Sequence, residues 1–349
     1  MEARVFLSRQ KSAHSFVVAV SLVVLIGFVL SVAAAQAQAT FVSISVPGAG
    51  QGTFPLEINR SGVIVGYFVD DSGVEHGFIR SANGTFTIVD NPPGSGGTQI
   101  TAINSLGLVA GFNDYSSGNT AFLRYRSGAF GSLYVPGATF VNPVAMNDGG
   151  EIAGVASLYF GAARGFVWSL GHSFTFTVPG AGSFVGVSGL NSSGTITGNY
   201  ADAIDQRTSH GYVRDSAGNV ASFDATNSTK ITRVSAINSS GVVTGYYLDS
   251  SDEEVQSFVR GTDGMITLLT LAGYQLYATG INDSGVIAGT AYTTSTATPF
   301  ESDAVGNVTL LPLPFNNVGS NVVAINRNGL VIGTYYDLNY VEHAWLMIP

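Results

Sequence analysis

The sequence predicts an all-β protein, a seven-bladed β-propeller of four-stranded blades, on three observations. The pattern Asn-x-x-Gly-x-x-x-Gly occurs seven times at intervals of 43 to 47 residues, a period typical of propellers and solenoids. The first six repeats each contain four short apolar runs separated by turn residues. The last repeat lacks its fourth run, and a matching run precedes the first repeat. The asparagines of the pattern are Asn59, Asn104, Asn147, Asn191, Asn238, Asn282 and Asn326.

The four runs are plainest in the second repeat. They cover Thr98 to Ile103, Leu108 to Asn113, Ala121 to Tyr125 and Phe130 to Val135. Aromatic and β-branched residues alternate with polar ones within the runs, and turn-forming residues lie between them. Four short strands in a repeat of about 44 residues exceed what one coil of a parallel β-helix holds, so a propeller blade is the better match.

The two ends of the repeat region predict a closed ring. The last repeat runs through His343-Ala344-Trp345 to Pro349 without a fourth run. Phe41 to Gly48 is similar to the fourth runs that start at Phe130 and Phe174. A ring in which this N-terminal strand completes the last blade leaves no unpaired sheet edge. We therefore expect closure by the N-terminal strand.

Two positions of the pattern have a structural explanation. The Asn-x-x-Gly segment is typical of a tight turn between the first and second strands, because the Asn side chain can bond its own backbone and Gly tolerates positive φ. The second glycine lies inside the second strand, where glycine ordinarily weakens a sheet. Its presence in every repeat predicts a close backbone approach or a β-bulge near the axis. These glycines are Gly66, Gly111, Gly154, Gly198, Gly245, Gly289 and Gly333.

The first 39 residues have the layout of a secretory signal peptide. Basic residues at positions 4, 9 and 11 precede an apolar run from Phe16 to Val32, and an alanine-rich stretch ends at Ala39 with Ala-x-Ala cleavage sites. An uncleaved anchor is the alternative, since about 17 apolar residues approach the minimum for spanning a bilayer. No later run is long and apolar enough to span. We expect one propeller domain at residues 40–349, exported to the periplasm or the extracellular space.

Net charge and the lack of cysteine argue against several kinds of partner and covalent link. Residues 1–39 hold three of the 14 basic and one of the 23 acidic residues, so cleavage leaves 11 basic and 22 acidic residues and a net charge of −11. A surface of that sign repels phosphate backbones, which argues against nucleic acid as a partner. The lack of cysteine excludes disulfides, thiolate metal sites and a lipid-modified cysteine. We expect an exported bacterial monomer held by its apolar core.

A third repeated element begins the third run of most repeats. It reads His76-Gly77-Phe78, Arg164-Gly165-Phe166, His210-Gly211-Tyr212 and His343-Ala344-Trp345. In this element the chain resembles the bacterial extracellular repeats named after a His-Ala-Phe signature, the HAF repeat family. Three repeats depart from it, with Thr120-Ala121-Phe122, Gln256-Ser257-Phe258 and Thr298-Pro299-Phe300. The resemblance implies a secreted, β-propeller-like repeat protein and brings no established activity.

No catalytic residue follows from the sequence. The Gly-x-Ser-x-Gly, Gly-x-x-x-x-Gly-Lys, His-Glu-x-x-His and EF-hand patterns do not occur. His76, His210 and His343 occupy one place in three different repeats, away from the axis, so a ring keeps them too far apart to share a metal ion. We expect each histidine to be packed or hydrogen-bonded on its strand.

Acidic residues and tyrosines are concentrated in one part of the repeats, beyond what the scaffold requires. Twelve of the 22 acidic residues after position 39, and ten of the fifteen tyrosines, lie in or beside the connections between second and third strands. In a propeller these connections emerge on one face. The candidate ligand-binding residues there are Asp70, Asp71, Asp114, Tyr115, Tyr200, Asp202, Tyr247, Asp249, Tyr336 and Asp337. The alternative is a set of solvated hairpin tips.

An acidic and aromatic face suits two ligand classes. Sugars stack on exposed rings while carboxylates accept their hydroxyl hydrogens, and Ca²⁺ takes oxygen ligands. The favoured function is a non-catalytic binding or surface-interaction module for a glycan, a cation or an extracellular protein, with Ca²⁺ as the one conceivable cofactor. Two alternatives stay open: a carbohydrate-active hydrolase or lyase with facing carboxylates near the axis, and a structural envelope component.

Overall fold

The computed structural model describes residues 39–90, 96–115, 118–159, 161–225, 231–248, 255–313, 315 and 317–349. The chain divides into two units, Met1–Gln38 and Ala39–Pro349, and every described residue belongs to the second. The expected signal peptide, apart from Ala39, lies outside the described residues. Within them all regular secondary structure is β-strand, which confirms the predicted all-β class. This part of the chain also contains no helix that is long and apolar enough to cross a membrane.

The described residues form 28 strands, which take the first to fourth places of the sequence repeats. The first strands are β2 (Gly52–Ile58), β6 (Gly97–Ile103), β10 (Ala138–Met146), β14 (Ala181–Leu190), β18 (Thr232–Ile237), β22 (Gln275–Ile281) and β26 (Gly319–Ile325). The second strands are β3 (Ile64–Val69), β7 (Val109–Tyr115), β11 (Ile152–Leu158), β15 (Ile196–Asp202), β19 (Val243–Leu248), β23 (Ile287–Tyr292) and β27 (Val331–Tyr336). The third strands are β4 (Glu75–Arg80), β8 (Gly118–Arg124), β12 (Ala163–Ser169), β16 (Ser209–Arg214), β20 (Val255–Arg260), β24 (Ala297–Ser302) and β28 (Glu342–Ile348). The remaining strands are β1 (Thr40–Ile44), β5 (Phe86–Val89), β9 (Phe130–Leu133), β13 (His172–Phe176), β17 (Val220–Phe223), β21 (Ile266–Leu269) and β25 (Val308–Leu310).

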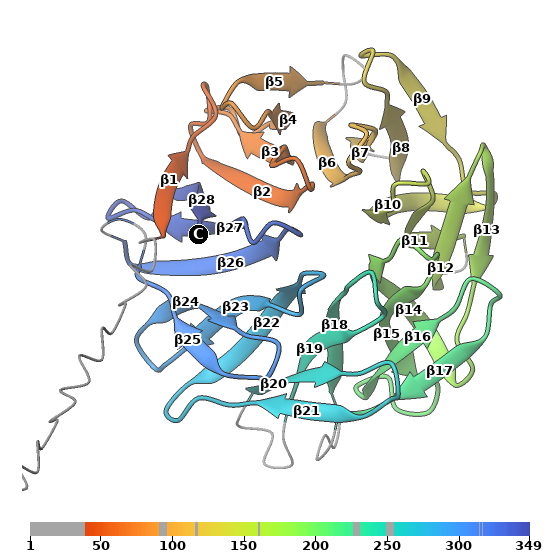
Figure 1. Cartoon of the computed structure of the whole chain (residues 1–349). Helices are drawn as coiled ribbons and strands as arrows, with labels where there is room; N and C mark the ends of the chain where they lie inside the picture. The colour runs from red at the N-terminus through yellow and green to blue at the C-terminus, as the bar shows by residue number, and fades with distance from the viewer. Residues whose placement is uncertain are drawn as a thin grey trace, which may run out of the picture. The chain divides into compact units, whose positions relative to one another are not determined.

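Successive strands of a repeat pair antiparallel. Three sheets have four strands, in the orders β1-β28-β27-β26, β18-β19-β20-β21 and β22-β23-β24-β25. Two sheets have eight, because single parallel pairs, Glu75 with Gly97 and Ala163 with Phe184, link neighbouring repeats. Within this unit, first strands such as β2 and β6 surround the centre and fourth strands such as β9 and β17 lie outside (Figure 1). Residues from the first strands line two cavities along the axis, which together we call the channel.

The mid-strand glycines face a β-bulge, as the sequence predicts. Each first strand has a register shift, such as that between Ile100 and Ala102, and the glycine pairs with the residue just before it. A Cβ on Gly111 would overlap the carbonyl oxygen of Gln99 and press on the ring of Phe122. The same overlap with a first-strand carbonyl recurs at all seven glycines. Close backbone approach therefore explains why no side chain stands there.

The repeated asparagines shape their turns and also link neighbouring repeats. Oδ1 of Asn59 accepts the backbone N–H groups of Ser61 and Val63 at 2.9 and 3.0 Å, which confirms the predicted turn. Its Nδ2 donates to the carbonyl oxygen of Asn104 in the next repeat at 3.0 Å. Equivalent bonds to the following asparagine carbonyl are made by Asn104, Asn147, Asn191, Asn238 and, back to the first repeat, Asn326. This asparagine ring surrounds one end of the channel.

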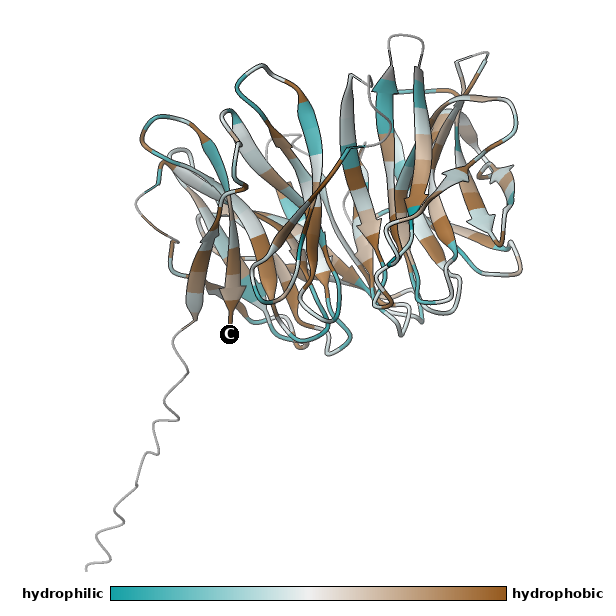
Figure 2. Cartoon of the chain, turned by 90° about the horizontal axis from the view of Figure 1, so that it is seen from above, coloured by the Kyte–Doolittle hydropathy of each residue, from teal (hydrophilic) through white to brown (hydrophobic). Residues whose placement is uncertain are grey.

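Apolar side chains between neighbouring sheets form the core. The aromatic residue of each third strand is at most 3 % exposed: Phe78, Phe122, Phe166, Tyr212, Phe258, Phe300 and Trp345. Burial of one such side chain contributes about 1.5–3 kcal/mol relative to its exposure. Figure 2 shows apolar residues concentrated within the strands and polar residues in many of the connections at either end. Function is therefore best sought at the ends of the channel.

Candidate ligand-binding face

Three of the predicted acidic residues organise turns. Asp70, Asp202 and Asp337 begin connections between second and third strands. Oδ1 of Asp70 accepts the N–H groups of Ser72 and Val74, both at 2.9 Å. The bond from Val74 N–H, then that from the Ser72 hydroxyl, lowers the pKa of Asp70 to about 2. Backbone N–H groups likewise lower the pKa of Asp202 and of Asp337. These carboxylates already have partners within the fold.

The histidines of the third strands are the other partners of these acids. Oδ2 of Asp70 lies 3.3 Å from Nε2 of His76, whose Nδ1 lies 2.9 Å from Asp90. The imidazole stacks on Phe68 with ring centroids 5.0 Å apart. His210 repeats this arrangement with Asp202, Asp224 and Tyr200, and His343 with Asp337, Ser45 and Tyr335. The prediction of packed, hydrogen-bonded histidines is confirmed.

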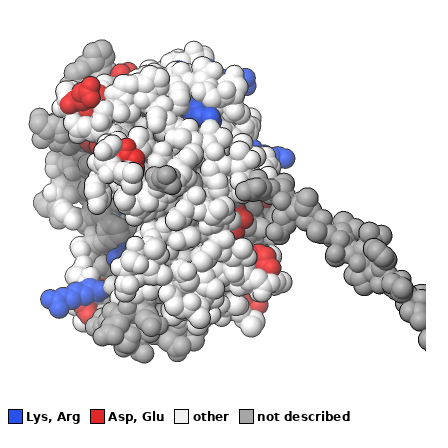
Figure 3. Space-filling model, turned by 90° about the vertical axis from the view of Figure 1, so that its left-hand side faces the viewer, with Lys and Arg blue, Asp and Glu red and all other residues white. Residues whose placement is uncertain are grey.

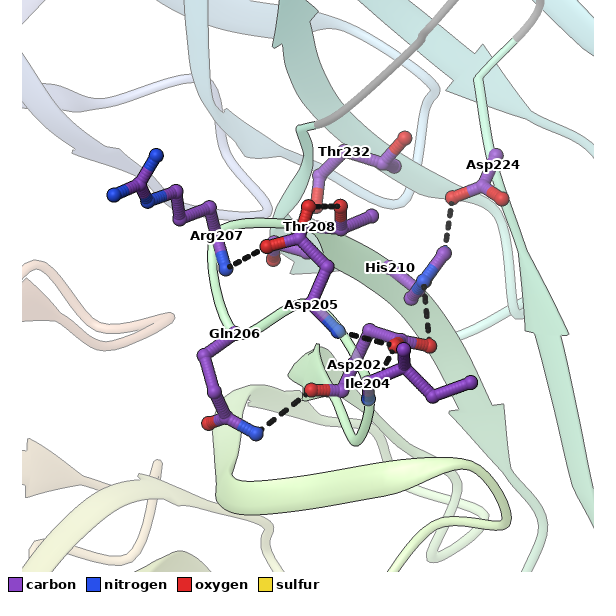
Figure 4. A network of polar contacts seen from close by, with 10 residues as sticks. Asp202, Ile204, Asp205, Gln206, Arg207, Thr208, His210, Asp224 and Thr232 are labelled. Carbon is purple, nitrogen blue, oxygen red and sulfur yellow. Dashed lines mark hydrogen bonds and ion pairs between the residues drawn. The ribbon is translucent and has the colours of Figure 1, made fainter.

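The connection between β15 and β16 is held by its own acids. Oδ1 of Asp202 accepts hydrogen bonds from the backbone N–H groups of Ile204 and Asp205 (Figure 4). The carboxylate of Asp205 accepts one from the backbone N–H of Arg207 and one from the hydroxyl of Thr208. Gln206 donates to the carbonyl oxygen of Asp202 at 2.8 Å. Ile204 stands 97 % exposed at the tip. This connection thus forms a loop that is held by its own hydrogen bonds.

The other predicted residues are divided between surface and core. Asp71 is exposed, Asp114 is half-buried in β7, and Tyr115 ends that strand. Asp249 lies outside the described residues. Tyr200 and Tyr247 are only 6 % and 2 % exposed and pack in the core, so the expectation of solvent-exposed rings is wrong for both. Tyr336, at the end of β27, is half-buried. The face is therefore less uniform than the sequence predicts.

Five tyrosines lie at the ends of first and second strands on this face, and we call Tyr246, Tyr277, Tyr292, Tyr336 and Tyr67 the tyrosine arc. The ring centroids of Tyr246 and Tyr277 are 4.9 Å apart, and those of Tyr277 and Tyr292 are 5.1 Å apart. The Tyr292 hydroxyl donates to Oδ1 of Asn321 at 2.5 Å. Tyr67 stacks on Phe54 at 4.8 Å. All five side chains are partly exposed.

Two carboxylates join the arc. Glu342 hydrogen-bonds Tyr336, and this bond is the largest cause that raises the pKa of that tyrosine to about 12. Burial, followed by the charges of Glu75 and Glu342, raises the pKa of Tyr67. Oε2 of Glu75 accepts from Gln99 at 2.7 Å. The tyrosines therefore stay protonated as hydrogen-bond donors at neutral pH, beside acceptor carboxylates.

The sequence interpretation missed the part of the arc that first strands supply. Five residues before each repeated asparagine, the first strands carry Phe54, Gln99, Asn142, Gly186, Arg233, Tyr277 and Asn321. The position differs in almost every repeat, whereas the turn residues nearby are nearly constant. It lies at the end of the strand remote from the asparagine ring. The variability of this first-strand position was the feature of the sequence that could have indicated a binding face.

A cavity adjoins the arc. It measures about 530 Å³ and is lined by Tyr292 together with Tyr274, Gln256, Gln275 and Thr294. This volume is in the range of small-molecule sites. On the side of the unit seen in Figure 3, charged side chains are scattered among uncharged ones and form no continuous patch in the described residues.

Comparisons with known proteins identify the fold. No family model and no curated protein matches the chain. A streptogramin B lyase structure has a TM-score of 0.56 at 12 % identity over 88 % of this chain and 97 % of its own. A catalytically inactive virginiamycin B lyase from Staphylococcus aureus with quinupristin has a TM-score of 0.55 at 12 % identity, over 89 % of this chain and 100 % of its own. The β-propeller domain of the Trilobed protease from Pyrococcus furiosus has a TM-score of 0.60 at 10 % identity, over 86 % of this chain and 94 % of its own. At these identities the likeness shows the fold alone: the chain is a β-propeller.

Proposed function

We propose that this chain is an exported, seven-bladed β-propeller, closed by its N-terminal strand, that acts as a non-catalytic glycan-binding module. The signal-peptide layout of residues 1–39 supports export. The resemblance to the HAF repeat family agrees with a secreted location, in the periplasm or outside the cell. The tyrosine arc is the observation that carries the choice of ligand.

Three contacts support the seven-bladed closure. All of β1 pairs with β28, from Thr40 opposite Ile348 to Ile44 opposite Ala344. Ser45 bonds His343 from the position that Asp90 and Asp224 occupy in other repeats. The last repeat also bonds the first through Asn326 and Asn59. β1 thus does for the last repeat what a fourth strand does for the others.

The arc favours a glycan over a cation. Adjacent tyrosine rings offer flat faces for sugar rings, and their hydroxyls together with Glu75, Glu342 and Gln99 offer donors and acceptors for sugar hydroxyls. By contrast, the oxygens of Asp70, Asp202 and Asp337 already bond backbone N–H groups and histidines. The Ca²⁺ expectation based on those acids therefore has weaker support than the glycan expectation.

The test measures binding of the chain from residue 40 to soluble neutral and acidic polysaccharides by calorimetry or affinity electrophoresis. Tyr277→Ala and Tyr292→Ala should each weaken binding about two- to tenfold, on the scale of aromatic contacts of about 0.5–1.5 kcal/mol. Tyr292→Phe keeps the ring and should bind better than Tyr292→Ala. Tyr134→Ala, which removes an exposed tyrosine beside β9, should bind like the parent. No binding to any polysaccharide, or equal weakening by Tyr134→Ala, would favour a protein partner or a structural role.

A further inference from the structure

One residue in the channel breaks the repeat. Glu57 lies two positions before Asn59 on β2, and the equivalent residues are all small. They are Ala102, Ala145, Gly189, Ala236, Gly280 and Ala324. The fold therefore accepts a side chain of one carbon or none at this position. A glutamate there is not required by the scaffold.

Glu57 lines two cavities on the axis. One, of about 220 Å³, lies at the asparagine ring, and the other, of about 240 Å³, lies deeper along the first strands. Aliphatic side chains common to both separate them, among them Ile58, Met146 and Ile281. Oε2 of Glu57 accepts the N–H of Ile103 from the neighbouring first strand at 2.8 Å. The carboxyl is deep in the fold but keeps partial exposure to these cavities.

The deeper cavity is lined by further oxygen atoms. Residues at the β-bulges of four first strands are hydroxylic: Thr101, Ser188, Ser235 and Thr279. Oγ1 of Thr101 is buried and has no hydrogen-bond partner within the described part of the chain. Ser188 accepts a hydrogen bond from Asn199, and Thr279 donates one to the carbonyl oxygen of Ala288, so both hydroxyl oxygens retain a lone pair for a cation.

The carboxyl is also energetically unfavourable in its unliganded setting. Burial raises the pKa of Glu57 to about 8, and the N–H of Ile103 only partly offsets this. At neutral pH the group is mainly protonated unless a positive charge binds beside it. Alanine, as in the equivalent positions of four other repeats, would avoid this cost. The combination of cavity, oxygen lining and unfavourable acid points to a binding role.

We propose that Glu57 and the bulge hydroxyls form an axial site for a monovalent cation, either an alkali metal ion or a protonated primary amine. One carboxylate supplies one negative charge, and the remaining donors are neutral oxygens, which suit hard, singly charged cations. The acidic net charge of the chain raises the local concentration of such ions. This site is separate from the tyrosine arc and does not depend on glycan binding.

The surrounding charges permit such a site. No other charged residue occurs in β3, β6 or β26, which pack against β2. The ionisable groups Tyr67, Tyr335, Tyr336, Glu342 and His343 lie on β3, β27 and β28 toward the arc. The cavity at the asparagine ring is lined by Arg60, Arg327, Asp148 and Asp283, whose charges cancel. Glu57 is therefore the uncompensated acid of the two cavities.

Proton release gives a direct readout of this site. The cation requires ionised Glu57, so binding should release about 0.9 proton at pH 7 and about 0.1 at pH 9, given a pKa of about 8. Calorimetric titration with potassium chloride, sodium chloride and methylammonium chloride in two buffers of different ionisation enthalpy measures this number. Choline chloride, whose quaternary ammonium has no N–H to donate to a carboxylate, keeps the ionic strength constant. The potassium, sodium and methylammonium arms distinguish metal ion from amine.

Two variants decide the outcome. Glu57→Ala reproduces the residue of other repeats and should fold, while Glu57→Gln keeps an acceptor for Ile103 without the charge. The parent should bind one of the cations and gain melting temperature with the logarithm of its concentration, and both variants should lose the shift and the proton release. Absence of binding by the parent to any of the three cations would overturn the site. So would equal binding by Glu57→Gln, or binding without proton release at pH 7.

Discussion

Asn326 donates a side-chain N–H to the carbonyl oxygen of Asn59, 267 residues earlier in the chain, at 2.9 Å. The same side chain accepts the backbone N–H groups of Asn328 and Leu330 through Oδ1. Both asparagines are buried. One residue type therefore forms the turns and also links most neighbouring repeats.

Asn326→Asp should separate these two roles. Aspartate keeps an acceptor for the turn but has no N–H for Asn59, so we expect a loss of about 1–3 kcal/mol in the free energy of unfolding. Asn326→Ala should lose more, because the turn bonds go as well. Urea unfolding at pH 7 measures both. Asn83→Asp, in an exposed turn where the side-chain oxygen is the acceptor, is the control. Equal unfolding midpoints for Asn326→Asp and Asn83→Asp would contradict the linking role.

Removal of residues 40–48 tests the proposed closure. The deletion leaves the edge of β28 unpaired and removes Ile44 and Val46, which are 1 % and 3 % exposed in the core. We expect a markedly lower melting temperature or aggregation, since an open apolar edge pairs with other chains. A synthetic peptide of residues 40–48 should restore part of the melting temperature. A truncated chain with the melting temperature of the parent would contradict closure by the N-terminal strand.

Gly111→Val should be far more damaging than a comparable change on the outside. The new side chain would meet the carbonyl oxygen of Gln99 and the ring of Phe122, and overpacking of this kind costs about 1–3 kcal/mol or more. Thr87→Val, at an exposed position of β5, introduces the same residue into a strand without a clash and is the matched control. Thermal unfolding should separate the two variants. Similar melting temperatures would mean that the β-bulge can shift to make room for a valine side chain.

The repeat pattern predicted the strands, the bulge and the turns, because these depend on residues close in sequence. It did not predict which tyrosines reach solvent. Tyr246 and Tyr247 are adjacent on β19, yet only Tyr246 joins the arc, since successive side chains of a strand point to opposite faces. Tyr200 has the same register as Tyr247 and is buried for the same reason. Tyr277 was missed because it belongs to a first strand, and its proximity to Tyr292 arises only from the pairing of β22 with β23.

The Asp–His pairs predict a pH dependence of stability. Burial alone would lower the pKa of His76, but hydrogen bonds to Asp90 and Asp70 outweigh it and raise the pKa above 6.5. A raised folded-state pKa stabilises the fold fully below the unfolded value and loses this contribution as pH rises through the folded value. His76→Asn should therefore lower the melting temperature more at pH 5.5 than at pH 8.5. His172→Asn, on the exposed end of β13, is the control. An equal penalty at the two pH values would contradict this role.

Glu57 predicts a pH dependence of the same sign between its unfolded and folded pKa values. Its pKa is about 8 in the fold against an ordinary 4.5, so between these values the unfolded chain is ionised while the folded one is not. Stability should fall as pH rises from 5 to 8, and Glu57→Gln, which cannot ionise, should not show this fall. One pKa unit corresponds to about 1.4 kcal/mol, and partial exposure to the cavities reduces the effect, so the two unfolding free energies should diverge by on the order of 2 kcal/mol. Urea unfolding in choline chloride, without sodium or potassium, measures this divergence. Parallel stability curves for the parent, Glu57→Gln and Glu57→Ala would show that the carboxyl is solvated like a surface acid.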